Sequence, residues 1–135
     1  MSDNLTNFSF SKKSNRQETL RVDIRHGKLN ANLQAFRYID RDTKQVVYFI
    51  PSLEISGYGE DDTKAAEMLR FSLTDFSAHL LLQPREKIHA ELAELGWKKG
   101  IFNKEYSKAY VDVNGELQNL NAEENKVERL TLTAA

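Results

Sequence analysis

The residues that most often carry out chemistry in proteins are absent or scattered in this sequence. The chain of 135 residues has no cysteine, so it offers no thiolate nucleophile, no cysteine ligand for zinc and no disulfide. Its histidines, His26, His79 and His89, have no close spacing that would indicate a metal site. We expect these three side chains at the surface or at an edge, and we expect no bound metal.

Carboxylates are plentiful, but they gather in segments typical of turns and helix caps. The segments DRDTK (40–44), GEDD (59–62) and NAEEN (121–125) are explained by solvation and capping without a general acid or base. No Ser or Thr has the context of a nucleophile elbow. We predict no catalytic residue and no cofactor, and the alternative is a small enzyme in which distant carboxylates converge.

The segment GYGEDDTKAAEML (57–69) joins a strand-like run to a helix-like run. Gly57 and Gly59 lack the third glycine of a dinucleotide-binding loop, and the acids that follow place negative charge where a phosphate would lie. Phosphate binding is therefore not expected. The acids suit the positive end of a helix dipole, so Asp61 or Asp62 is predicted to cap the helix.

Basic and aromatic residues are interleaved after the second predicted helix. Such a patch can hold a phosphate backbone while its rings stack on bases. The alternative interpretation is a solvated rim whose aromatic rings belong to the core, and no signature of a known RNA-binding module is present. The members of this basic-aromatic patch are Trp97, Lys98, Lys99, Phe102, Lys104, Tyr106 and Lys108.

The strands that must position these groups follow from period-two alternation. Runs at 19–28, 32–40 and 45–51 predict three strands, and a shorter alternation at 52–59 predicts a fourth strand or an extended arm. Residues 1–18 are polar apart from isolated apolar side chains, so we predict a mobile tail there and a single α+β domain over residues 19–135.

Helical periodicity predicts one helix at about 62–82 and another at about 84–95. Strand patterns return from residue 97, with a hairpin turn at Asn114 and Gly115. The order β-β-β-(β)-α-α-β-β-β predicts an α+β fold, in which two helices pack on one face of a mainly antiparallel sheet.

The first predicted helix carries two apolar stripes. One stripe faces the sheet and consists of Ala65, Ala66, Leu69, Leu73, Phe76 and Leu80. The other lies on a different side of the helix and consists of Met68, Phe71, Ala78 and Leu82. Either the second helix or the C-terminal strands cover this second stripe, or it is the interface for a partner chain.

Charge and hydropathy exclude two broad classes of partner. Nineteen basic and twenty acidic residues give a net charge of −1, so no global attraction to nucleic acid or to an anionic membrane is expected. No segment approaches the ~20 apolar residues that span a bilayer, and the first eighteen residues contain no apolar run typical of a signal peptide. We expect a cytoplasmic protein.

The segment VVYFIPSLEISGYGEDDTKAAEMLRFSLTDF (46–76) resembles the core of the HicB-like antitoxin family, through Pro51, Leu53, Gly57, Gly59 and Ala65. Asp61 stands where that family has a capping Thr, and Lys64 stands where it has Glu. The resemblance implies a small three-stranded sheet with helices, dimerisation and the blocking of a small ribonuclease toxin. Many members also carry a C-terminal DNA-binding segment, whereas residues 97–135 predict strands here.

These observations favour a non-enzymatic protein-interaction module, because such a module requires the fold and one apolar patch but no chemistry. We expect a homodimer and, through the resemblance, binding of a small partner protein. The alternatives are an RNA-binding module that uses the basic-aromatic patch and a small enzyme with convergent carboxylates.

Overall fold

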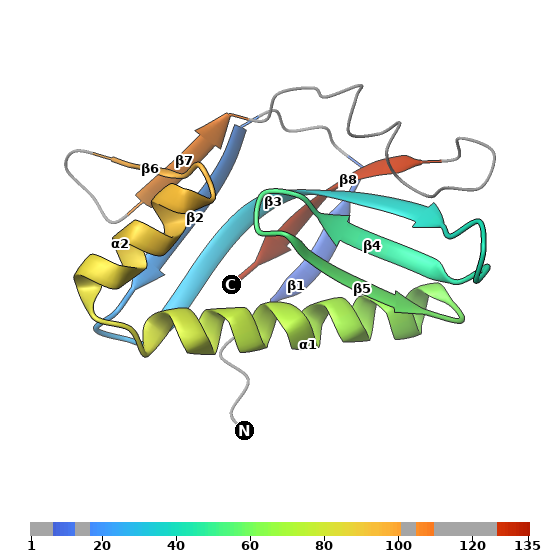
Figure 1. The fold of residues 1–135 in the computed structure, drawn as a ribbon, viewed down its shortest axis with the longest axis horizontal. Helices are drawn as coiled ribbons and strands as arrows, with labels where there is room; N and C mark the ends of the chain where they lie inside the picture. The colour runs from blue at the N-terminus through green and yellow to red at the C-terminus, as the bar shows by residue number, and fades with distance from the viewer. Residues whose placement is uncertain (1–6, 13–16, 101–104, 110–126) are drawn as a thin grey trace.

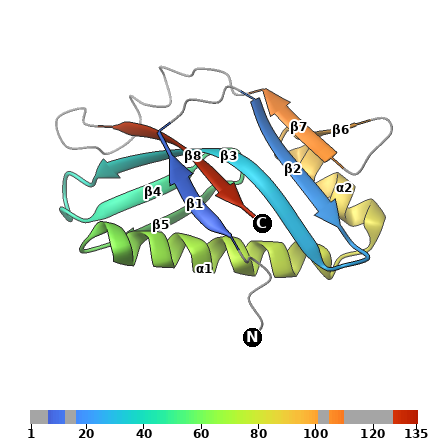
Figure 2. The same cartoon turned by 180° about the vertical axis from the view of Figure 1, so that it is seen from behind.

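The computed structural model describes residues 7–12, 17–100, 105–109 and 127–135. The elements are β1 (Phe8–Ser11), β2 (Gln17–Asp23), β3 (Lys28–Ile39), β4 (Val46–Ile50), β5 (Ile55–Gly59), α1 (Asp62–Leu81), α2 (Arg85–Glu94), β6 (Lys98–Lys99), β7 (Glu105–Ala109) and β8 (Glu128–Ala134). An antiparallel sheet and two helices confirm the predicted α+β class (Figure 1). In the rear view β1, β8, β3 and β2 lie in front, while α1 runs along the lower edge (Figure 2).

The longest strand, β3, organises the sheet because it pairs with three other strands. β8 pairs with residues 31–37 of β3, β2 with residues 28–32 and β4 with residues 36–39. Since the β8 register overlaps both of the others, β2 and β4 share the opposite edge of β3. The sheet therefore forks at residues 33–35 of β3, with β2, β7 and β6 in one branch and β4 and β5 in the other.

The prediction of a tail is wrong for β1 and for the start of β2. β1 pairs antiparallel with β8, which places Phe8 opposite Ala134 and Phe10 opposite Leu132. The Phe10 ring lies 4.8 Å from the Tyr48 ring, so this strand packs against the core. Its pairing partner lies at the other end of the sequence, which explains why a local pattern does not reveal it.

Two glycines of β5 bring the sheet and α1 into direct backbone contact. A Cβ built on Gly57 would lie 2.4 Å from the backbone nitrogen of Leu69 and 2.6 Å from the carbonyl oxygen of Ala65. A Cβ on Gly59 would lie 2.6 Å from Cβ of Lys64. Because no side chain separates the two backbones, the rotation of α1 about its axis is fixed by this contact.

The predicted inner stripe of α1 is largely confirmed, since Ala65, Leu69, Leu73 and Leu80 are buried, while Ala66 and Phe76 are half-buried. Both helices fall close to their predicted bounds. β5 begins at Ile55, later than predicted, because residues 51–54 form a turn. The predicted hairpin at Asn114 and Gly115 lies outside the described residues.

Replacing Gly57 by Ala tests the backbone contact. We expect Gly57→Ala to lower the free energy of unfolding by roughly 3 kcal/mol, because the new methyl group meets backbone atoms that cannot rotate away. Urea denaturation followed by circular dichroism measures the loss. Gly27→Ala is the control, since Gly27 has φ +61° and open space around it, so its cost is only the roughly 1 kcal/mol of a left-handed conformation. Equal losses in the two variants would contradict the contact.

Candidate functional site

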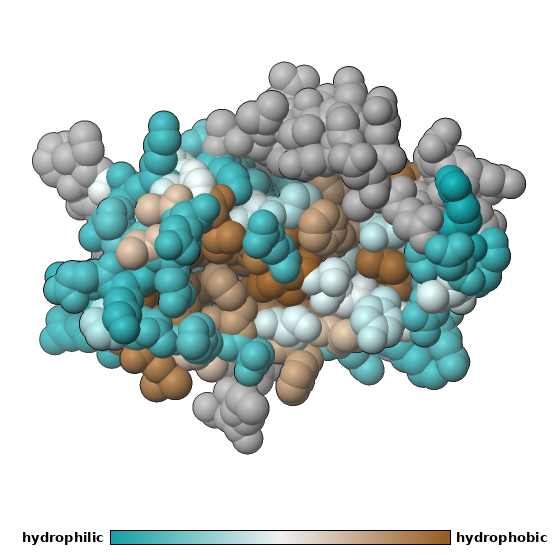
Figure 3. All heavy atoms as spheres, viewed as in Figure 1, coloured by the Kyte–Doolittle hydropathy of each residue, from teal (hydrophilic) through white to brown (hydrophobic). Residues whose placement is uncertain are grey.

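The outer face of α1 carries the two most exposed of the large apolar side chains in the described part of the chain, together with Met68. Phe71 is 66% exposed, Leu82 at the end of the helix 84% and Met68 37%. Ala78, the fourth member of the predicted stripe, is half-buried. Figure 3 shows brown and tan surface along the lower edge of the molecule, where Figure 1 places α1.

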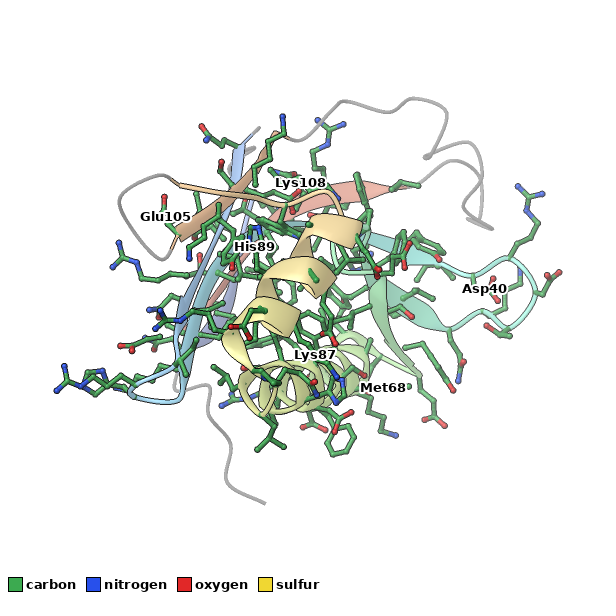
Figure 4. All side chains as sticks on the ribbon, turned by 60° about the vertical axis from the view of Figure 1, so that its left-hand side comes forward. Asp40, Met68, Lys87, His89, Glu105 and Lys108 are labelled. Carbon is green, nitrogen blue, oxygen red and sulfur yellow. The ribbon has the colours of Figure 1, made fainter. Side chains whose placement is uncertain are left out.

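Strand β5 borders this surface through its backbone. Tyr58 is 51% exposed, and its backbone N–H donates to Sδ of Met68 at 3.5 Å. Figure 4 labels Met68 beside the coil of α1. Met68 and Phe71 are called the outer patch below. The Tyr58 side chain points to the opposite face of β5, because Gly57 and Gly59 face the helix and the residue between them must face the other way. There it lines a shallow surface hollow with Asp40 and Val47.

Charged residues flank the outer patch on both sides along α1. Lys64 donates to Glu60 at 3.1 Å on the N-terminal side of the patch. Asp75 and His79 lie on the C-terminal side, and His79 Nε2 stands 3.9 Å from Oε1 of Glu91. The apolar centre of the helix face is thus bordered by charges of both signs.

Helix α2 does not cover the outer patch. It buries Ile88 and Leu92, and it packs beside β6 at the other branch of the sheet. Trp97, which follows α2, donates its ring N–H to the carbonyl of Ser52 at 3.2 Å. The sequence analysis named the second helix and the C-terminal strands as elements that could bury the second stripe. Phe71 is exposed among the described residues, so α2 does not bury it.

Two aromatic members of the basic-aromatic patch lie within the described residues. Trp97 and Tyr106 are both buried, which favours the interpretation that the rings belong to the core over the alternative that they stack on bases. Lys108 donates from Nζ to the carbonyl of Leu95, which makes it a cap for the end of α2. Lys98 and Lys99 are exposed on β6. Phe102 and Lys104 lie outside the described residues.

The two predicted cap residues have different roles. Asp61 is the N-cap, because its carboxylate accepts from the backbone N–H of Lys64 at 2.9 Å. Asp62 instead accepts from Arg37 Nε at 2.5 Å and from the Tyr48 hydroxyl at 2.7 Å. Hydrogen bonding by Arg37 lowers the pKa of Asp62. Burial, together with the bond to Asp62, raises the pKa of Tyr48 to about 12. The cluster therefore joins β3 and β4 to α1 through an ion pair between Arg37 and Asp62 and a hydrogen bond from the Tyr48 hydroxyl.

Glu18 is a buried carboxylate that fills the fork in the sheet. Its Oε2 accepts from the backbone N–H of Gln34 at 2.9 Å and from the Ser52 hydroxyl at 2.7 Å. Gln34 lies in the stretch of β3 that no strand pairs on this edge, so the carboxylate replaces a missing strand. Burial raises the pKa of Glu18, and the two hydrogen bonds and the charge of Lys108 partly oppose this shift.

The remaining polar groups offer no assembled catalytic centre within the residues described. No three His, Asp or Glu side chains of this part of the chain come together as a metal site. All three histidines are exposed, as predicted. Asp40, labelled in Figure 4, accepts from the backbone N–H and the hydroxyl of Thr43, so its Oδ2 holds the turn between β3 and β4. Neither helix of the described residues has the length and apolar content to cross a bilayer.

Comparisons with family models, with curated proteins and with solved structures found no match to this chain. The resemblance of residues 46–76 to the HicB-like family therefore stays an expectation from the sequence. The geometry of the outer patch has to carry any functional conclusion by itself.

The buried position of Glu18 predicts a specific pH dependence. Because its folded-state pKa is raised, the contribution of Glu18 is fully present below its unfolded pKa and is lost as the pH rises through the folded pKa. Glu18→Gln keeps an acceptor but does not ionise. We expect the free energy of unfolding of this variant, relative to wild type, to increase as the pH rises from the unfolded pKa of Glu18 through its folded pKa.

Urea denaturation at a series of pH values measures this difference. Glu94→Gln, at an exposed position of α2, is the matched control and should show a much smaller change with pH. The difference in free energy of unfolding between Glu18→Gln and wild type could instead stay constant or fall as the pH rises. Either result would contradict the view that burying the ionised Glu18 side chain destabilises the fold.

Proposed function

We propose that this chain is a non-enzymatic protein-interaction module whose working surface is the outer patch. The observation that carries the proposal is the 66% exposure of Phe71 beside Met68 on a well-anchored helix. Exposed aromatic side chains on a rigid element are typical anchors of protein interfaces, and their cost in water is recovered when a partner buries them.

The chemistry of the surface indicates the chemistry of its partner. The partner is a folded protein chain that offers an apolar surface with charges of both signs around it, because Glu60, Lys64 and Asp75 surround the patch. The carboxylates nearest to α1 serve the fold, since Asp61 caps the helix and Asp62 pairs with Arg37. This use of the acids supports binding in preference to catalysis.

The resemblance to the HicB-like family supplies one biological setting for such a module, in which the bound protein is a small ribonuclease toxin. The cytoplasm is the location that we propose, because a chain without cysteine has no use for an oxidising compartment. Neither setting is needed for the physical proposal that the outer patch binds protein.

Photo-crosslinking from inside the interface tests the proposal. A benzophenone amino acid in place of Phe71 keeps an aromatic side chain there, and irradiation of cells of the native host should join it to a protein chain. The same amino acid in place of Asn30, which is exposed on β3, is the control and should give no defined product. No product at position 71, or the same products at both positions, would overturn the proposal.

A further inference from the structure

We propose that the chain bound to the outer patch is a second copy of this protein, with the two α1 helices antiparallel about a two-fold axis between Leu69 and Arg70. This inference rests on the proposed function and names its partner. In a two-fold interface each residue meets the position related to it by the axis, so a surface suited to itself must place complementary groups at symmetric distances from that axis.

The outer face of α1 meets this condition in one register. In a pair of antiparallel helices, the residue numbers of two facing positions always have the same sum. An axis between residues 69 and 70 makes this sum 139, which sets Met68 against Phe71 of the other copy. The same axis sets Lys64 against Asp75, and it brings Glu60 toward His79. Apolar groups thus meet at the centre, and opposite charges meet on both sides of it.

Neighbouring registers lose this match. A shift of four residues in one direction sets Glu60 against Asp75, and a shift of three residues in the other sets Glu67 against Asp75, so acids oppose acids in both cases. A shift of four residues in this second direction sets Lys64 against His79, so the pair with Asp75 is lost. A parallel pair of helices would set Lys64 against Lys64 and Asp75 against Asp75. Like charges in contact disfavour an interface, so charge selects both the direction and the register.

The central charged pair can form at little cost. Among the described residues Lys64 forms an ion pair with Glu60, and both side chains are largely exposed, at 58% and 79%. An exposed pair four residues apart on a helix is weak, so exchanging it for a pair across the interface costs little. The net charge of −1 also adds almost no repulsion between two copies.

The test exchanges the charges at the two ends of the patch. K64D would set an acid against Asp75 of the other copy, and D75K would set a base against Lys64. Sedimentation equilibrium at about 100 μM should show a dimer for wild type and a dimer weakened about tenfold or more by each single variant. The double variant K64D/D75K restores opposite charges and should recover the dimer.

Lys87→Asp is the matched control, because it changes the net charge by the same amount at an exposed site on α2. It should leave the dimer unchanged, and circular dichroism should show every variant folded. Single variants that dimerise like wild type, or a double variant that stays as weak as the singles, would overturn the register. A monomeric wild type would overturn self-association, and the proposed function would then stand or fall on the crosslink at position 71 to a different protein.

Discussion

The direct backbone contact between β5 and α1 at Gly57 determines what this protein presents to its surroundings. With Leu69 N only 2.4 Å from where a Cβ would lie, the backbones of β5 and α1 touch, so a roll that turned a larger side chain of the helix toward Gly57 would meet the strand. Leu69 and Leu73 therefore point into the core, and Phe71 must point out. The Asp61 cap and the pairing of Arg37 with Asp62 hold the start of the same helix, so the exposed face is a consequence of the fold.

A second constraint keeps that face uncovered. The fork in the sheet separates the branch that carries α2 from the branch that carries α1, and Glu18 joins the two branches through Gln34 and Ser52. The hydrogen bond from Trp97 to Ser52 then ties the end of α2 to the same point. Because α2 is fixed on its own branch, it cannot move over the outer patch (Figure 1).

Features that depend on neighbouring residues could be predicted from the sequence, whereas features that depend on distant contacts could not. Periodicity gave both helices, and local chemistry gave the cap at Asp61. The role of Glu18 was missed because its partners lie sixteen and thirty-four residues away. The need for a glycine at position 57 was also missed, since only the packed helix shows why a Cβ is not tolerated there. The burial of Trp97 also depends on distant contacts, so the residues around it in the sequence do not show whether its ring is buried or exposed.

The claim that α1 pairs with itself in an antiparallel arrangement is tested most directly by distances between spin labels. The chain has no cysteine, so single labels at Glu67→Cys and Leu82→Cys are unambiguous. About an axis between residues 69 and 70, the two labels in a dimer lie ~8 Å apart along the helix axis at position 67 and ~38 Å apart at position 82. A short distance at position 67 with a long one at position 82 is the predicted result. Equal distances at the two positions, or no coupling between copies, would contradict it.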